Sequence, residues 1–301
     1  MDQLDAMRIF LRVAELASFT QAATSLGLPK ASVSGAVQRL EPQLGVRLLQ
    51  RTTRRVQLTQ DGQAYYERSR DLLADMEELH GMFSRDATRL TGRLRVDMPA
   101  SLARLGLLPR LPEFLAQHPG LALELGCSDR RVDLVREGFD CVIRVGALAD
   151  SSLVARPLGL LRQINCASPA YLARHGVPQG LDDLAAHRIV HYQSVLGGQA
   201  PVFEYLDGAG LCCSLPMEAA LTVNATDAYA AACLAGLGII QSPRAGLRAY
   251  LAEGRLVEIL PDYAAPPLPV HLLYPNRRHL PRRVQAFMGW VAEALGDYLQ
   301  A

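Results

Sequence analysis

The sequence predicts a chain of three parts: an α-helical winged helix-turn-helix domain at residues 1–59, a long linker helix at 60–90, and a two-lobed α/β domain at 91–301. The first part has apolar residues at helical spacing, with a glycine-containing turn between two helices. A heptad pattern without proline follows. From residue 91, strand-like and helix-like segments alternate over about 210 residues, which is too many for one α/β layer.

The composition excludes several classes of protein. Hydrophobic residues make up 50% of the chain and charged residues 20%, so a disordered chain is excluded. The first residues resemble no export signal and no apolar run is long enough to span a membrane, so we expect a cytoplasmic protein that does not contact membranes. The six cysteines form no Cys-x-x-Cys pair, so the sequence predicts no metal site, and it indicates no cofactor.

The net charge of +1 hides a gradient along the chain. Residues 1–59 carry eight basic and four acidic side chains, residues 60–90 carry four and seven, and the remainder is balanced. A basic head on a neutral body indicates a polyanionic partner for the head alone.

The first two helices have clear local signals. The apolar spacing of residues 4–14 predicts a helix with one buried stripe. Ser18 and Gln21 have the spacing of a capping box, which predicts that a short second helix starts there. Gly27 tolerates a positive φ angle and is expected to end this helix.

The third helix is predicted to begin after Pro29 and to bury a narrow apolar stripe. Pro42 has no N–H to donate to the carbonyl of Gln38, so we expect the helix to end or kink there. The opposite face has small and polar side chains that leave room for another molecule. The stripe comprises Val33, Val37, Leu40 and Leu44, and the opposite face Ala31, Gly35, Gln38 and Arg39, flanked by Ser32 and Ser34.

Residues 48–59 are predicted to form a short strand pair, the wing of the domain. Threonines and the alternation around Val56 favour strands, with Arg51, Arg54 and Arg55 in or beside the turn. Next to a recognition helix, these arginines are placed to meet phosphates. The alternative is a solvated charged loop.

The linker helix has an apolar seam. Tyr65, Leu72 and Leu79 recur every seven residues, with Met76 and Phe83 at the intermediate positions. Such a seam on a helix of roughly 45 Å is typical of a coiled coil, so we expect it to pair two copies of the chain. The alternative is that the seam packs against the chain's own body.

The body is predicted to be a parallel α/β structure because strand and helix patterns alternate. Strands are expected at 94–98, 121–125, 140–145, 188–192, 217–223, 238–241 and 270–274, with a further short unit at 255–259. Helices are expected at 102–114, 132–137, 169–174, 227–235 and 281–299.

The order and spacing of motifs along the whole chain closely resemble the LysR-type transcriptional regulators. In the head, the resemblance is carried by residues 14–23, 33–34, 39–41, 44–49 and by Arg51-Thr52-Thr53-Arg54-Arg55. In the body, it is carried by residues 108–119, 129–135, 138–140, 143–146, 167–172, 235–239 and 274–280.

This resemblance implies a DNA-binding domain, a dimerising linker helix and an effector domain similar to a type 2 periplasmic binding protein. Lobe I would comprise about 91–162 and 268–301, and lobe II about 163–267, with hinge strands near 161–167 and 268–274. It further implies a dimer or tetramer that binds double-stranded promoter DNA and responds to a small molecule held between the lobes.

The predicted DNA contacts lie on the second and third helices and on the wing. Gly35 departs from the family, which commonly has a long polar residue there, and this suggests an altered base preference. Arg39 could alternatively pack on the head's own surface. The predicted DNA-binding residues are Thr20, Gln21, Lys30, Ser32, Ser34, Gln38, Arg39, Arg51, Arg54 and Arg55.

The predicted effector site starts from the turn that precedes residue 102. Amides around Ser101 would form a helix N-terminus, which favours an anion, and Arg144 could pair with a carboxylate. We therefore expect a carboxylate-bearing effector. Alternatively, Ser101 is only a helix cap and Arg144 belongs to a structural ion pair. The predicted effector-binding residues, which include segments that face the cleft in the family, are Pro99, Ala100, Ser101, Arg144, Val145, Ser194, Asn224 and Thr226.

Two other classes of function are weaker hypotheses. An enzyme is disfavoured because the chain has no nucleophile-elbow, zinc-protease or phosphate-loop motif, so we expect no catalytic residues. A transport solute-binding protein would fit the body but needs an export signal and would not explain a basic helix-turn-helix head.

Overall fold

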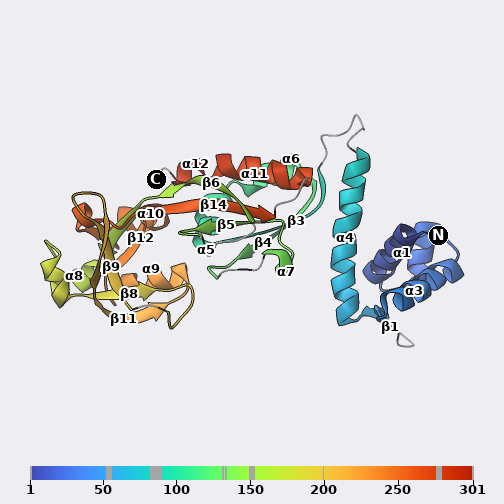
Figure 1. Ribbon diagram of the computed structural model, residues 1–301, viewed down its shortest axis with the longest axis horizontal. Helices are drawn as coiled ribbons and strands as arrows, with labels where there is room; N and C mark the ends of the chain where they lie inside the picture. The colour runs from blue at the N-terminus through green and yellow to red at the C-terminus, as the bar shows by residue number, and fades with distance from the viewer. Residues whose placement is uncertain are drawn as a thin grey trace. The chain divides into compact units, whose positions relative to one another are not determined.

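The computed structural model describes residues 2–51, 56–81, 90–130, 132, 134–148, 153–198, 200–275 and 280–299. The chain forms two compact units, Met1–Arg93 and Leu94–Ala301, and each is described here by itself (Figure 1). The predictions for Arg54, Arg55 and Phe83 fall outside the described residues. Within the described ranges, no helix is both long and apolar enough to cross a bilayer.

The N-terminal unit is a winged helix-turn-helix domain followed by a long helix, as predicted. Strands β1 and β2 pair antiparallel, with Leu49 opposite Leu58. Its elements are α1 (Gln3–Leu16), α2 (Phe19–Leu26), α3 (Lys30–Leu44), β1 (Leu49–Arg51), β2 (Val56–Leu58) and α4 (Gln60–Gly81).

Local capping sets the turn between α2 and α3. The Ser18 hydroxyl oxygen accepts a hydrogen bond from the backbone N–H of Gln21 at 3.2 Å and so caps the start of α2. Gly27, at a φ of 65°, ends the helix. The sequence signals for both helix ends are therefore confirmed.

Of the two outcomes expected at Pro42, an end or a kink of α3, the structure excludes the end. The helix continues to Leu44 and ends at Gly45, which has a φ of 71°. Pro42 lies in the last turn, where its missing N–H removes one hydrogen bond and leaves the remaining helix intact. Leu44 is also exposed rather than buried, and Ala36 takes the fourth buried position beside Val33, Val37 and Leu40.

The first half of α4 belongs to the core of the N-terminal unit. The rings of Phe10 and Tyr65 meet edge to face with centroids 5.4 Å apart. Leu73, just past the middle of α4, is buried in the same apolar cluster as Phe10, Val37 and Leu40. Packing within its own unit thus supports the long helix as far as Leu73.

One half of the C-terminal unit is built on a five-stranded sheet of order β4-β3-β5-β14-β6. Helices α11 and α12, drawn in red in Figure 1, pack on this sheet through an apolar core that includes Phe287 and Val291. The strands are β3 (Thr91–Met98), β4 (Gly120–Cys127), β5 (Cys141–Val145), β6 (Leu153–Leu161) and β14 (Leu268–Pro275). The helices are α5 (Ala100–Leu102), a π-helix (Ala103–Leu107), α6 (Leu111–Gln117), α7 (Leu134–Glu137), α11 (Arg282–Ala294) and α12 (Gly296–Leu299).

The other half has three small sheets and separate cores. β7 (Gln163–Ala167) lies between β12 (Ile240–Pro243) and β13 (Val257–Ile259), antiparallel to both. β8 (Arg188–Tyr192) pairs parallel with β11 (Glu218–Val223), and β9 (Val202–Leu206) pairs antiparallel with β10 (Cys212–Pro216). The α-helices are α8 (Pro169–His175), α9 (Thr226–Leu234) and α10 (Arg244–Ala252), with 3-10 turns at Asp182–Ala186 and Pro261–Tyr263.

Three predictions for the body are corrected. The large sheet is mixed, because β14 returns from the C-terminal end of the chain and pairs antiparallel with β5 and β6. The helix expected at 102–114 is interrupted after the π-helix, where Pro109 removes a backbone donor. Strand β6 was not predicted because Pro157 and Gly159 weaken its pattern, and the register shifts at that point. The β9–β10 hairpin and α10 were also missed.

Candidate nucleic-acid interface and ligand cavity

The outer face of α3 is polar and has open space at Gly35. Lys30, Gln38 and Arg39 are exposed, whereas Ser32 and Ser34 are half-buried. A Cβ atom added at Gly35 would meet only the end of the flexible Arg39 side chain, at 3.7 Å, so the surface beside Gly35 is otherwise open. Neither Lys30 nor Arg39 forms an ion pair with another described residue. The face therefore has uncompensated positive charge and polar side chains within reach of a second molecule.

Helix α2 contributes two further predicted contacts. Thr20 and Gln21 are exposed in its first turn. The Gln21 backbone N–H is bound by Ser18, and the Thr20 carbonyl accepts a hydrogen bond from the Thr24 hydroxyl at 3.1 Å. The backbone is thus satisfied locally, and the two side chains point outward.

Glu41 ties the recognition helix to the wing, a role that the sequence did not reveal. Its Oε1 accepts hydrogen bonds from the backbone N–H groups of Leu48 at 2.9 Å and Leu49 at 3.1 Å. Leu49 begins β1, and that strand ends at the predicted phosphate contact Arg51. One carboxylate therefore sets the position of the wing relative to α3.

The wing is also anchored to the start of α4. The Thr59 hydroxyl donates to the carbonyl of Arg47 at 2.6 Å and accepts from the N–H of Gly62 at 2.9 Å. A Cβ atom at Gly62 would lie 1.9 Å from the carbonyl oxygen of Leu48, so only glycine fits this approach. Residues 47–48 and 59–62 are consequently packed backbone against backbone.

The predicted seam of α4 is divided between two environments. Tyr65 packs into the core of its own unit. Further along, Leu72 and Leu79 are 47% and 57% exposed, and Met76 is half-buried. The outer half of the helix thus presents an apolar row that the described residues leave uncovered.

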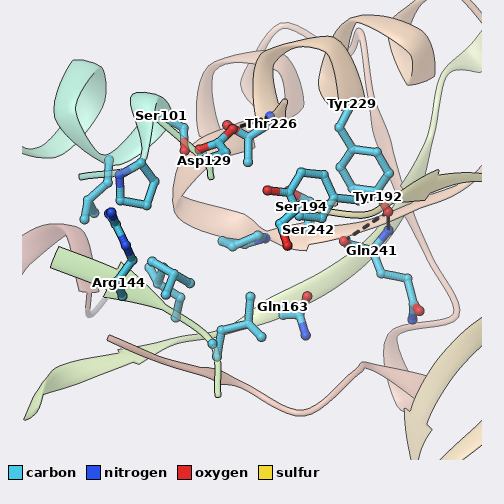
Figure 2. A pocket seen from close by; sticks show the side chains of 18 of the residues that line it. Ser101, Asp129, Arg144, Gln163, Tyr192, Ser194, Thr226, Tyr229, Gln241 and Ser242 are labelled. Atoms are coloured by element: carbon cyan, nitrogen blue, oxygen red, sulfur yellow. Dashed lines mark hydrogen bonds between the residues drawn. The ribbon is translucent and has the colours of Figure 1, made fainter. Parts of the chain in front are cut away.

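The C-terminal unit contains a cavity of about 560 Å³ between its two halves (Figure 2). This volume is in the range of small-molecule sites. Of the predicted effector residues, Pro99, Ser101, Arg144, Val145, Ser194 and Thr226 line it. Ala100 and Asn224 are not among the lining residues.

Arg144 forms a structural ion pair, which was one of the two alternatives for this residue. Its Nη2 lies 2.7 Å from Oδ2 of Asp97, and its Nη1 donates to the carbonyl of Ile143 at 2.9 Å. Asp97 is 3% exposed and also accepts from the Ser128 hydroxyl at 3.2 Å. This pair holds the guanidinium at the cavity wall, with N–H groups remaining beyond those two bonds.

Two polar contacts join the halves of the unit beside the cavity. The Thr226 backbone N–H, at the start of α9, donates to Oδ2 of Asp129 at 2.7 Å. Arg104, in the π-helix, lies 2.9 Å from Asp227 in the first turn of α9. A carboxylate of the chain itself therefore occupies the N-terminus of α9, where an anion is favoured.

Aromatic side chains form another part of the wall. The Tyr229 hydroxyl accepts from the Gln241 N–H at 3.0 Å, and the Tyr192 ring lies 5.7 Å from the Tyr229 ring. Burial, and to a lesser extent the charge of Asp129, raises the pKa of Tyr192 to about 12. Burial lowers the pKa of His191, so its imidazole is neutral at pH 7.

Comparison with known proteins identifies the class. Residues 4–63 match the bacterial regulatory helix-turn-helix model of the lysR family, and residues 87–296 match the LysR substrate binding domain. The chain therefore belongs to the LysR family of transcriptional regulators.

Full-length relatives support this assignment. The chain is 52% identical over 299 residues to YhjC, an uncharacterized HTH-type transcriptional regulator of Escherichia coli K12, covering 99% of this chain and 100% of the relative. It is 39% identical to an HTH-type transcriptional repressor of Pseudomonas aeruginosa, covering 99% and 93%. It is 30% identical to the solved structure of CrgA from Neisseria meningitidis, with a TM-score of 0.62 and coverage of 97% and 98%.

Proposed function

We propose that this LysR-type regulator binds promoter DNA through α3 and the wing, as a dimer or tetramer, under the control of a small molecule in the cavity. The observation that carries the proposal is the polar outer face of α3, where Lys30 and Arg39 form no ion pair with another described residue. Glu41 connects this helix to the wing, and the same chain contains a cavity of about 560 Å³. Action on promoter DNA would place the protein in the cytoplasm.

In this proposal Lys30, Arg39 and the wing arginines bind phosphates, whereas Ser32, Ser34 and Gln38 meet base edges in the major groove. Lysine and arginine provide the salt-dependent part of DNA affinity, and amide and hydroxyl groups distinguish base pairs. Thr20 and Gln21 would position α2 on the phosphate backbone.

The oligomer would form through the outer half of α4. The exposed apolar row of Leu72 and Leu79, with Met76 beside it, supports pairing with a second copy. Two linked heads bind two half-sites of a dyad with a gain in effective concentration.

The effector, we propose, carries a carboxylate that lies between Ser101 and the remaining N–H groups of Arg144. Both residues line the cavity, and a guanidinium bound to one carboxylate still has donors for a second. Since the cavity lies between the two halves of the unit, ligand binding would change their relative position and thereby the spacing of the paired heads.

The test of DNA recognition uses the full chain and a fragment of its own upstream DNA in a gel-retardation assay. Lys30→Ala should weaken binding to all sequences alike and reduce the slope of log affinity against log salt by about one, whereas Gln38→Ala should relax preference at particular base pairs. Arg255→Ala is the control, because that exposed arginine lies in the other unit and pairs with Glu253. An unchanged salt slope for Lys30→Ala would remove α3 from the phosphate contacts.

A further inference from the structure

Three polar atoms of the cavity wall are buried without a hydrogen-bond partner among the described residues. They are Oδ1 of Asp129, Oγ1 of Thr226 and Nδ1 of His191. Asp129 and Thr226 lie together at the top of the cavity beside Ser101, where the two halves of the unit meet (Figure 2). An ionised carboxylate only accepts hydrogen bonds, so Oδ1 of Asp129 lacks a donor.

The arginines of the wall are balanced within the chain, whereas Glu204, which also lines the cavity, forms no ion pair with another described residue. The arginines that line the cavity are each paired with an acid: Arg104 with Asp227, Arg130 with Glu137, and Arg144 with Asp97. Among the described residues, Asp129 has only the backbone N–H of Thr226 as a hydrogen-bond partner. The described wall therefore has a carboxylate oxygen that a cationic donor would satisfy, and its cations are already compensated.

We propose that the cavity holds a ligand with a protonated amine, which donates to Oδ1 of Asp129 and to the Thr226 hydroxyl. This inference rests on the proposed function, because it concerns the same cavity, and it adds a positive group to the carboxylate proposed above. The ligand would then be an amino acid or a close derivative of one.

Two features of the surroundings suit an amine. Asp129 lies close enough to Tyr192 for its charge to contribute to raising the pKa of that phenol. The Tyr192 and Tyr229 rings both line the cavity and supply apolar surface for the rest of the ligand, and an aromatic face also attracts a cation.

The experiment measures binding of matched probes to the full-length protein. The panel consists of the protein amino acids, each beside the carboxylic acid that lacks only the amine. Thermal shift selects the probes that bind, and calorimetry gives their Kd. We expect that amino acids bind and that their amine-free partners bind at least about tenfold more weakly, since a charge-assisted hydrogen bond is lost.

The variants distinguish loss of the contact to the ligand's amine from general effects on the cavity. Asp129→Asn should raise the Kd of a bound amino acid about tenfold or more and leave that of its amine-free partner within about twofold. Thr226→Val should weaken the same probe while keeping the backbone N–H that binds Asp129. Asp262→Asn is the control, because this exposed acid is not among the residues that line the cavity.

The inference is overturned if no amino acid binds, if amine-free acids bind as tightly, or if Asp129→Asn affects both kinds of probe equally. Retardation of upstream DNA by the same preparations is measured in parallel. Absence of DNA retardation by the parent protein would refute the proposed function. An overturned amine preference with intact DNA binding would refute this inference alone.

Discussion

The contact between Glu41 and the wing can be tested by removing one side chain. Glu41→Ala deletes the acceptor for two backbone N–H groups, those of Leu48 and Leu49, which are 0% and 4% exposed. A buried donor left without a partner costs roughly 1–3 kcal/mol, so the loss of both bonds should destabilise the joint between α3 and the wing by about 2–6 kcal/mol.

The assay is amide hydrogen exchange of the full chain, read on peptides that cover residues 46–51. A loss of about 2–6 kcal/mol should speed exchange there by roughly 30-fold to 20,000-fold, because each 1.4 kcal/mol is a factor of ten. Affinity for the upstream DNA should fall in parallel, since the wing is no longer held beside α3. Glu41→Gln is the control, because its amide oxygen can still accept both bonds and only the charge is lost.

The expected order of exchange rates is parent, then Glu41→Gln, then Glu41→Ala. If Glu41→Ala exchanges at the parent rate over residues 46–51, the two hydrogen bonds do not hold the wing and the reasoning fails. Faster exchange with unchanged DNA affinity would keep the structural role and remove the wing from the DNA interface.

Three further predictions concern the linker, the cavity and pH. Leu72→Glu puts a charge on the exposed row of α4, so we expect a monomer when the mass of the variant is measured by light scattering. A variant that stays dimeric refutes pairing through that row. Ser101→Val keeps the volume and removes a hydroxyl donor, so about tenfold more effector should be needed in a reporter assay, and an unchanged response would exclude the site. Burial, and to a lesser extent the charge of His175, lowers the pKa of His187 below 6.5 in the folded protein. As the pH drops below about 6.5, the unfolded chain therefore takes up a proton at this residue before the folded chain does, and the free energy of unfolding should decrease. Urea midpoints from Trp290 fluorescence at pH 7.5 and 5.5 check this, and a dependence unchanged in His187→Gln would show that another group is responsible.

The helices of the head could be predicted because their signals are local. A capping hydroxyl at Ser18, glycines at positions 27 and 45, and apolar residues three and four apart act within one or two helical turns. The position of Pro42 misled the prediction, since the same residue costs far less in the last turn of a helix than in its middle. The exposed residues of α3 could be identified in the same way.

The roles of individual side chains in the long helix and the wing needed tertiary contacts. A heptad pattern places Tyr65, Leu72 and Leu79 near one face, but α1 covers only the first of them. The sequence does not distinguish Glu41 from an ordinary surface acid. Its carboxylate accepts two backbone hydrogen bonds only because the chain turns back after Gly45. Periodicity gives the face of a helix and does not say which element covers it.

The sequence by itself determined the three-part organisation, the family and the residue types at the two binding regions, because these follow from local patterns and their order. The tertiary structure decided which of those residues share a cavity and what each one binds. Arg144 and Asp97 are 47 positions apart, and Asp129 and Thr226 are 97 apart. The order of the large sheet, with β14 between β5 and β6, was likewise decided by pairing across more than 100 positions. Such contacts depend on the free energy of the whole packed unit, and no local pattern of residues encodes them.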